Sequence, residues 1–332
     1  WAFIYPHATW GDLAHWLLII LAFVLLTAIF CLISFMHAYA FTHPTKNLKL
    51  GIERRGMELT LPNLIKSTII GIRPIRHSQS ENPSYYDLTY ENVTFNSTDG
   101  IILNGWLITA AKPKGTIIFA HGYNGNRGNI ALAKYLNENG YSILLFDFRG
   151  HGESGGNYIS MGYYETMDVM GAADYLKSRK DIDSKNLYGI GNSMGAAALV
   201  FAEEKESTFK GLILESTYAD IHQDTANRFN KVYGFPKFPF ATSLVFFAGL
   251  ILDVNAFSIS PLDSIKNIRK PILLIHDEND DSVTASDSTS LYENANYPKE
   301  IWIVNGASHS NAFYADSNGY KSKIRAFLNR ND

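Results

Sequence analysis

The sequence predicts an α/β fold: a mostly parallel eight-stranded sheet with helices on both faces, preceded by one membrane-spanning helix. From about Tyr85 onward, short apolar runs alternate with helix-like stretches, which is typical of a parallel sheet covered by helices. The later apolar runs are continuous, as expected for strands that are buried on both faces. Near the start of the chain, Leu17 to Met36 form a long run without any charged residue.

The uncharged run predicts a membrane anchor. At about 1.5 Å per residue it spans about 30 Å, the thickness of a hydrocarbon core, and Trp10, Trp16 and Tyr39 flank it where interfacial aromatic residues belong. A buried core helix is one alternative, but the run has no polar face. A cleaved signal peptide is another, because Ala38-Tyr39-Ala40 resembles a cleavage site, although signal h-regions extend over only about 7–15 residues. We therefore expect a retained single-pass helix.

Charges beside the run predict its orientation. Residues 1–16 contain no Lys or Arg, whereas Lys46, Lys49, Arg54 and Arg55 follow the run. The positive-inside rule then places the bulk of the chain on the cytoplasmic side of the membrane.

The chain divides into three predicted parts. Residues 1–36 form the N-terminal flank and the transmembrane helix, residues 37–84 a connector, and residues 85–332 an α/β domain. Within the connector, Met57–Ile72 favours a short amphipathic helix that lies on the membrane surface or packs on the domain.

Composition excludes several classes of function. The 29 Lys and Arg residues against 32 Asp and Glu residues give a net charge of −3, so no nucleic-acid surface is expected. A single cysteine, Cys31, excludes a disulfide framework and a cysteine-rich zinc site. No G-x-G-x-x-G motif opens a helix after a strand, so dinucleotide binding has no support. No cofactor or metal is expected.

The predicted elements follow in order. A turn at Asp99-Gly100 joins the first two strands into a hairpin. The strands are expected at 88–95, 101–109, 115–120, 142–146, 186–190, 211–214, 271–275 and 300–304, and the helices near 128–139, 161–179, 194–206, 219–231, 285–295 and 311–329.

One motif indicates a nucleophilic residue. The strand at 186–190 leads into Gly191-Asn192-Ser193-Met194-Gly195 and then a helix-like stretch, which is G-x-S-x-G in a strand–turn–helix context. Such a turn is tight enough to require small flanking residues, and its strain exposes the serine oxygen above the sheet. Ser193 is therefore the predicted nucleophile.

A serine nucleophile requires a base and an acid that orients the base. His309 lies in the loop after the last strand, in the chain order Ser–acid–His. His222 and His276 also follow the serine, but the first lies within a predicted helix and the second precedes the acid. For the acid, the loop after strand 271–275 offers Asp280, which we favour, ahead of Asp281, Asp277 and Glu215.

Attack on a carbonyl creates an oxyanion that requires preorganised N–H donors. The backbone N–H of Met194 is one predicted donor. The other is the N–H of Tyr123, in the loop after strand 115–120. His121 in the same loop is expected to support the loop rather than transfer protons.

At these residues a resemblance appears. The segments HGYNGN at 121–126, DFRGHGESGG at 147–156, GNSMG at 191–195, PILLIHDENDDSV at 271–283 and NGASH at 305–309 are similar to α/β-hydrolases. Among these the chain resembles a membrane-anchored bacterial branch related to serine-aminopeptidase-like and esterase-like enzymes. The resemblance implies the α/β-hydrolase fold and a scaffold role for Asp147, Arg149 and His151. Asp277 replaces the glycine that is usual in the family.

The stretch 215–270 is long enough for a small cap over the site. Its aromatic residues either line an acyl pocket or pack the cap; they are Phe229, Tyr233, Phe235, Phe238, Phe240, Phe246, Phe247 and Phe257. Asp220, Asp224, Arg228 and Lys231 are its charged residues that can turn inward.

Three functions compete. The first is a serine hydrolase that cleaves small-molecule or lipid-like acyl esters near a membrane. The second is a peptidase of the same fold, and the third a catalytically inactive membrane-tethered binding module. The intact set of Ser193, Asp280 and His309 argues against the third function.

Overall fold

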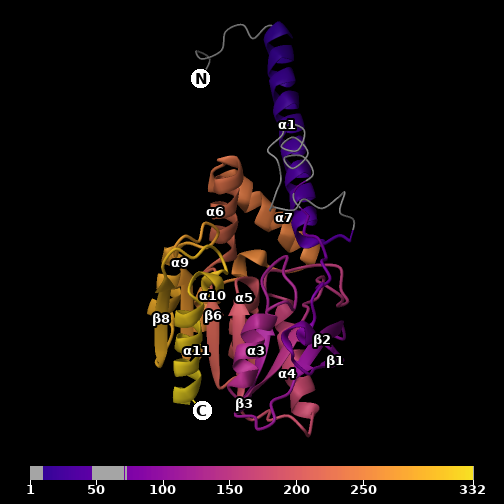
Figure 1. The fold of residues 1–332 in the computed structure, drawn as a ribbon. Coiled ribbons are helices and arrows are strands. Elements are labelled where there is room, and N and C mark those ends of the chain that lie inside the picture. The colour runs from indigo at the N-terminus through magenta and orange to yellow at the C-terminus, as the bar shows by residue number, and fades with distance from the viewer. Residues whose placement is uncertain (1–9, 47–70, 72, 332) are drawn as a thin grey trace.

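The computed structural model describes residues 10–46, 71 and 73–331, and it contains the predicted mostly parallel sheet of eight strands. The sheet order is β1-β2-β4-β3-β5-β6-β7-β8 (Figure 1). Only the β1–β2 and β2–β4 pairs are antiparallel. The strands are β1 (Glu91–Asn96), β2 (Ile102–Ile108), β3 (Gly115–Ala120), β4 (Tyr141–Phe146), β5 (Leu187–Asn192), β6 (Gly211–Glu215), β7 (Ile272–Asp277) and β8 (Lys299–Val304).

The predicted hairpin is confirmed. β1 pairs with β2 with Asn96 opposite Ile102, and Gly100 has a φ of 88° in the connecting turn, a conformation that favours glycine. The strands β3 and β4 are buried along their whole length, which explains why their sequences are mostly apolar.

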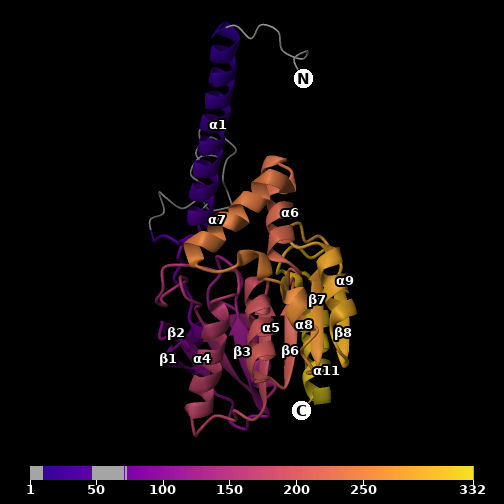
Figure 2. The same cartoon turned by 180° about the vertical axis from the view of Figure 1, so that it is seen from behind.

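Helices cover both faces of the sheet (Figures 1 and 2). One apolar cluster lies between the sheet and helices α3 and α11, and a second lies between the sheet and helices α4, α5, α8 and α9. Their bounds are α3 (Ile130–Glu138), α4 (Glu165–Ser178), α5 (Met194–Glu206), α8 (Pro261–Ile265), α9 (Ala285–Asn294) and α11 (Ser317–Asn331), with η1 (Pro83–Tyr86) and α10 (Ala312–Ala315) as short connections.

The N-terminal helix α1 (Trp10–Thr42) is long and apolar enough to cross a membrane. It extends to Thr42, beyond the predicted end of the apolar run at Met36. Residues 13–29 are exposed, whereas most of the later residues pack on the domain. Beyond α1, Thr45 forms a parallel bridge with Ile75. Lys49, Arg54, Arg55 and all of the predicted helix Met57–Ile72 except Gly71 lie outside the described residues.

A helical cap lies between β6 and β7, within the predicted stretch 215–270. It consists of α6 (Ile221–Tyr233), η2 (Lys237–Ala241), α7 (Thr242–Leu252) and η3 (Ala256–Ser258), followed by α8. Helix α7 was not among the elements predicted from the sequence. Helix α7 has no charged residue and lies beside the base of α1, as Figure 2 shows, where Phe247 meets Phe35 with ring centroids 6.0 Å apart.

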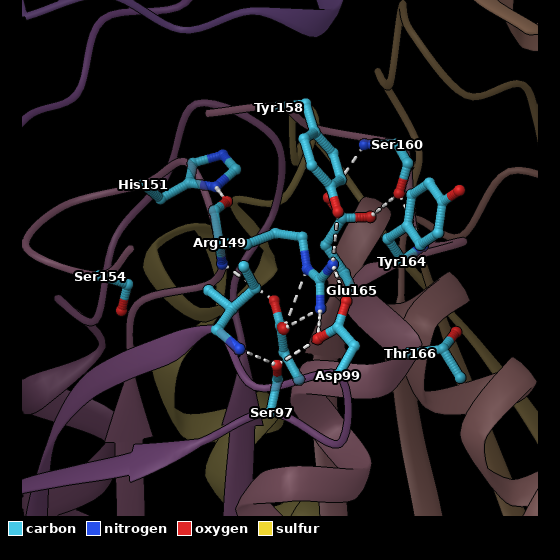
Figure 3. A network of polar contacts seen from close by, with 12 residues as sticks. Ser97, Asp99, Arg149, His151, Ser154, Tyr158, Ser160, Tyr164, Glu165 and Thr166 are labelled. Atoms are coloured by element: carbon cyan, nitrogen blue, oxygen red, sulfur yellow. Dashed lines mark hydrogen bonds and ion pairs between the residues drawn. The ribbon is translucent and has the colours of Figure 1, made fainter. Parts of the chain in front are cut away.

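A buried arginine holds the loop after β4. Arg149 is fully buried and donates to Asp168 Oδ1 from Nε at 3.0 Å and from Nη2 at 2.6 Å. Its Nη1 and Nη2 also donate to the two Asp99 oxygens, each at 2.8 Å (Figure 3). Two carboxylates therefore neutralise the cation and fix the loop to α4 and to the β1–β2 turn. This is the scaffold role that the resemblance implies.

Candidate active site

A cavity of about 560 Å³ lies over the carboxyl ends of the central strands, beneath the cap. Ligands bind at this edge of open α/β sheets. The lining residues come from α1, the segment 73–79, the loops after β3 and β4, the turn after β5, the cap and the loop after β8. They are His37, Phe41, Arg73, Pro74, Gln79, His121, Gly122, Tyr123, Asn124, Gly125, Asn126, Gly128, Asn129, Met161, Asn192, Ser193, Thr225, Arg228, Phe229, Leu244, His309 and Ser310.

Ser193 occupies a sharp turn between β5 and α5. Its φ is 51° and its ψ is −116°, a conformation that costs a non-glycine residue free energy. A Cβ at Gly191 would lie 2.7 Å from the backbone of Ala196, and a Cβ at Gly195 would lie 2.1 Å from Ala120 O. The two glycines of the motif are therefore required by close backbone approach, and they leave Ser193 at the cavity wall.

The structure brings together the three predicted side chains. His309 Nε2 lies 3.2 Å from Ser193 Oγ, and His309 Nδ1 lies 2.7 Å from Asp280 Oδ2. Ser193 follows β5, Asp280 follows β7 and His309 follows β8, so three strand ends position the three groups. The distances are those that a serine, a base and an orienting acid require.

Asp280 is held in its ionised form. Burial alone raises the pKa of this carboxyl, but the hydrogen bond from His309 and the charge of that ring outweigh burial. The backbone N–H groups of Ser282 and Val283 donate to Oδ1 at 2.8 and 2.9 Å. The net pKa of Asp280 is therefore below its usual range. An ionised acid at this position fixes the Nδ1–H tautomer of His309.

The other candidate acids have other partners. Asp281 is exposed and pairs with Lys231 of the cap. Asp277, which replaces the usual glycine, is buried and accepts from Ser216 Oγ at 2.6 Å. Glu215 accepts from Tyr320 Oη at 2.7 Å and from the Ala312 N–H at 3.1 Å. Glu215 therefore binds the segment that follows His309 rather than the imidazole itself.

The remaining histidines are engaged elsewhere. His222 Nε2 contacts Thr242 Oγ1 at 3.0 Å, and His276 Nδ1 contacts Ser288 Oγ at 2.9 Å. Both nitrogens of His121 are in contact with backbone groups, at Gly122 O and at the Phe148 N–H. These contacts fit the expected supporting role of His121.

The loop after β3 lies against the serine. A Cβ at Gly122 would come within 3.5 Å of Ser193 Cβ, and the neighbouring Tyr123 lines the same cavity. The Tyr123 ring stacks on Phe41 of α1 at 4.6 Å, and its hydroxyl donates to Phe41 O at 2.7 Å. Two contacts with α1 therefore hold the residue whose N–H is a predicted oxyanion donor.

Of Asp220, Asp224, Arg228 and Lys231, the charged residues expected to turn inward, only Arg228 lines the cavity. Its Nε donates to Asp224 at 2.7 Å, while Nη2 is buried and has no hydrogen-bond partner in the described part of the chain. Asp220 caps α6 by accepting from the Gln223 N–H. Together with Arg73, Arg228 makes the wall cationic, and the lining residues include no Asp or Glu.

The aromatic cap residues divide between both expected roles. Phe229 lines the cavity at Ser193, whereas Phe247 packs on α1 and Phe238 and Phe246 are exposed. Sequence reasoning missed the contributions of α1 and of Arg73 to Gln79, because these residues lie outside the predicted domain and nothing in their pattern shows what they face.

Comparisons with known proteins agree with this fold. A family model described as serine aminopeptidase, S33, matches residues 111–243. The uncharacterized protein YqkD of Bacillus subtilis is 32% identical over 243 residues, 71% of this chain and 78% of that protein. The lysophosphatidylserine lipase ABHD12 of Macaca fascicularis is 27% identical over 67% of this chain and 58% of its own length. A solved Pyrococcus furiosus esterase, Pf2001, superposes with a TM-score of 0.67 at 26% identity, over 77% of this chain and 97% of that one.

Proposed function

Because the chain belongs to the α/β-hydrolase superfamily, we propose that it is a serine hydrolase that cleaves acyl esters of lipid-like molecules through an acyl-enzyme intermediate. The observation that carries the proposal is the continuous contact from Ser193 through His309 to Asp280 at the wall of a large cavity. No cofactor or metal is needed for this chemistry.

The proposed reaction has two halves. Ser193 Oγ attacks the ester carbonyl while His309 Nε2 takes its proton, and the same imidazole returns that proton to the leaving alcohol. The N–H groups of Tyr123 and Met194 stabilise the oxyanion. Water, deprotonated by His309, then attacks the acyl-enzyme, releases the fatty acid and restores the Ser193 hydroxyl.

The charge of the cavity favours an ester over an aminopeptidase substrate. An aminopeptidase must bind the ammonium group of a peptide N-terminus, and leaving such a group unpaired costs about 1–3 kcal/mol or more. The described lining residues offer Arg73 and Arg228 but no carboxylate. A cationic wall suits an anionic substrate. The macaque relative is named a lipase for lysophosphatidylserine, which is an anionic single-chain lipid.

A fluorophosphonate probe tests this function. We expect it to label the full-length wild-type protein at Ser193, and Ser193→Ala to abolish both labelling and hydrolysis while the protein remains folded. Loss of one member of such a triad commonly costs several orders of magnitude in kcat. Acyl esters and aminoacyl amides should be assayed side by side. Faster cleavage of the amides would establish the peptidase, and a folded Ser193→Ala variant of normal activity would exclude this mechanism.

A further inference from the structure

A second, smaller cavity lies between α1 and the cap. Its volume is about 170 Å³. Helix α1 contributes Phe30, Ile33, Ser34 and His37, and the cap contributes Phe229, Phe235, Phe240 and Leu244. The walls are largely apolar. The Phe235 and Phe240 rings stack at 4.3 Å, and Phe30 meets Phe240 edge-on at 5.5 Å.

This second cavity, called the crevice below, adjoins the larger cavity that contains Ser193. His37, Phe229 and Leu244 line both. The ring centroids of His37 in α1 and Phe229 in α6 are 6.0 Å apart. Together with Leu244 of α7, these two residues form the boundary between the two cavities. The two cavities together run from Ser193 up the side of α1.

The crevice lies at the point where the exposed apolar part of α1 ends and its packing on the cap begins. Residues 13–29 of α1 are exposed and apolar throughout most of their length, while Phe30 is the first residue that packs on the cap. The predicted span Leu17–Met36 is about as long as a hydrocarbon core is thick, and its last turns include Phe30, Ile33 and Ser34 of the crevice. Beside it, Phe238, Phe246 and Leu250 of the cap are 75%, 51% and 63% exposed. The cap therefore presents exposed apolar side chains beside the end of the span, because Phe246 contacts Phe247, which meets Phe35 of α1.

We infer that this crevice is the acyl-chain site, and that the acyl chain of a membrane lipid enters it sideways from the bilayer, with α1 as one wall. The inference rests on the proposed function and names its substrate as a single-chain lipid ester that never leaves the membrane completely. The acyl chain occupies the crevice and passes beside the ring contact of His37 with Phe229, along the boundary that these residues share with Leu244, which places its carbonyl at Ser193. Helix α1 is then part of the substrate site as well as an anchor.

A photoreactive probe tests the site directly. An alkyl fluorophosphonate with a long chain that ends in a diazirine should label Ser193 of the full-length protein in lipid vesicles. After irradiation, we expect the crosslinks to lie within residues 30–37 of α1 or 229–244 of the cap. Labelling of Ser193 with crosslinks only at Gln79, Asn126 or Asn129, on another wall of the larger cavity, would overturn the inference. Absence of any label on Ser193 would instead contradict the proposed function.

Substitutions provide a second, independent test. Ile33→Trp fills the crevice, whereas Leu32→Trp adds the same bulk on the exposed side of α1. Each buried methylene is worth about fourfold in kcat/KM at the usual free energy of transfer. We expect Ile33→Trp to lower the ratio of kcat/KM for a long-chain ester to that for a butyryl ester at least tenfold. Leu32→Trp should leave the ratio unchanged, and equal ratios in the two variants would refute the acyl site.

Phe30→Ala covers the case in which Ile33→Trp fails to fold. This variant lengthens the crevice toward the membrane by removing one of its rings. The preferred chain length should then increase by at least two methylenes. An unchanged chain-length optimum in Phe30→Ala would contradict the inference.

Discussion

Arg228 is one of the two arginines that line the cavity. Its side chain is 19% exposed, and Asp224 neutralises it on one side only, through Nε. The buried Nη2 retains donors that water reaches poorly, and a buried donor without a partner costs about 1–3 kcal/mol. A phosphate or carboxylate of the substrate would satisfy these donors, because guanidinium groups bind such anions in a planar, two-point geometry.

We therefore predict that Arg228→Gln selectively impairs anionic substrates. The kcat/KM for a monoacyl ester of glycerophosphate should fall about 10- to 100-fold, because hydrogen bonds to charged groups are worth about 1.5–3 kcal/mol. The kcat/KM for a neutral monoacylglycerol of the same chain length should change much less. The double variant Asp224→Asn/Arg228→Gln controls for the carboxylate that the single variant leaves without its partner. An equal loss on both substrates would exclude Arg228 as the anion-binding group.

At the scale of elements, the loop that carries His309 is held by Glu215 directly and by Asp277 through Ser216, whose Oγ accepts from the Ser310 N–H at 3.5 Å. Glu215 ends β6 and binds the Ala312 N–H, while Asp277 ends β7 and accepts from Ser216. Burial, followed by the neighbouring charge of Asp277, raises the pKa of Glu215 to about 7. Protonated Glu215 is therefore the favoured form in the folded protein over much of the acidic range.

This raised pKa predicts a pH-dependent stability. Below about pH 4.5 the carboxyl is protonated in both the folded and the unfolded states, so its contribution is fully present. As the pH rises toward 7, the unfolded state releases the proton first, and the free energy of unfolding decreases. Glu215→Gln should remove this decrease, gaining about 1–3 kcal/mol relative to wild type between pH 4.5 and 7.

Thermal unfolding of the detergent-solubilised protein at pH 4.5 and pH 7 measures the effect. Glu206→Gln, on an exposed side chain at the end of α5, is the matched control, because it removes a carboxyl outside the buried cluster. If the difference between Glu215→Gln and wild type is the same at both values, Glu215 titrates normally in the folded protein.

The sequence predicted the elements of the sheet better than those of the cap. Every strand from β1 to β8 was predicted with a boundary error of at most about three residues, because alternation with helices and continuous apolar runs identify buried parallel strands. Helix α7 was missed, because Thr242–Leu252 is apolar on all sides and has no helical periodicity. Its apolar character became interpretable only once its contact with α1 was visible.

The candidate site shows the same division. Ser193, Asp280 and His309 could be predicted because each follows a recognisable strand, and the chain order of the three is typical of the fold. The contributions of His37, Phe41 and Arg73 could not be predicted, since nothing local in a helix or connector indicates which distant cavity it borders. Glu215 was an alternative acid in the sequence, and only the contacts distinguish its role from that of Asp280.

At the scale of the whole molecule, α1 is joined to the catalytic domain by many contacts. Ser34 Oγ lies 3.0 Å from Ser243 Oγ of α7, and Phe41 stacks on Tyr123. Ala38 and Ala40, the small residues of the possible signal-peptidase site, are buried within this helix. Cleavage after Ala40 would remove His37 from the cavity wall and expose the surface of α7 that α1 covers.

We therefore predict that the mature protein retains α1 and stays in the membrane after extraction with alkaline carbonate. Mass spectrometry of the mature chain should recover peptides that precede Phe41. Protease added to intact cells should leave the catalytic domain uncut, because the positive charges that follow α1 favour a cytoplasmic location, whereas protease added after the membrane is opened should digest exposed segments. A mature chain that begins at Phe41 and remains in the soluble fraction would establish a cleaved signal peptide. Digestion in intact cells would show that the catalytic domain lies on the opposite side of the membrane. The packing of α1 on the cap, and hence the acyl site between them, does not depend on that orientation.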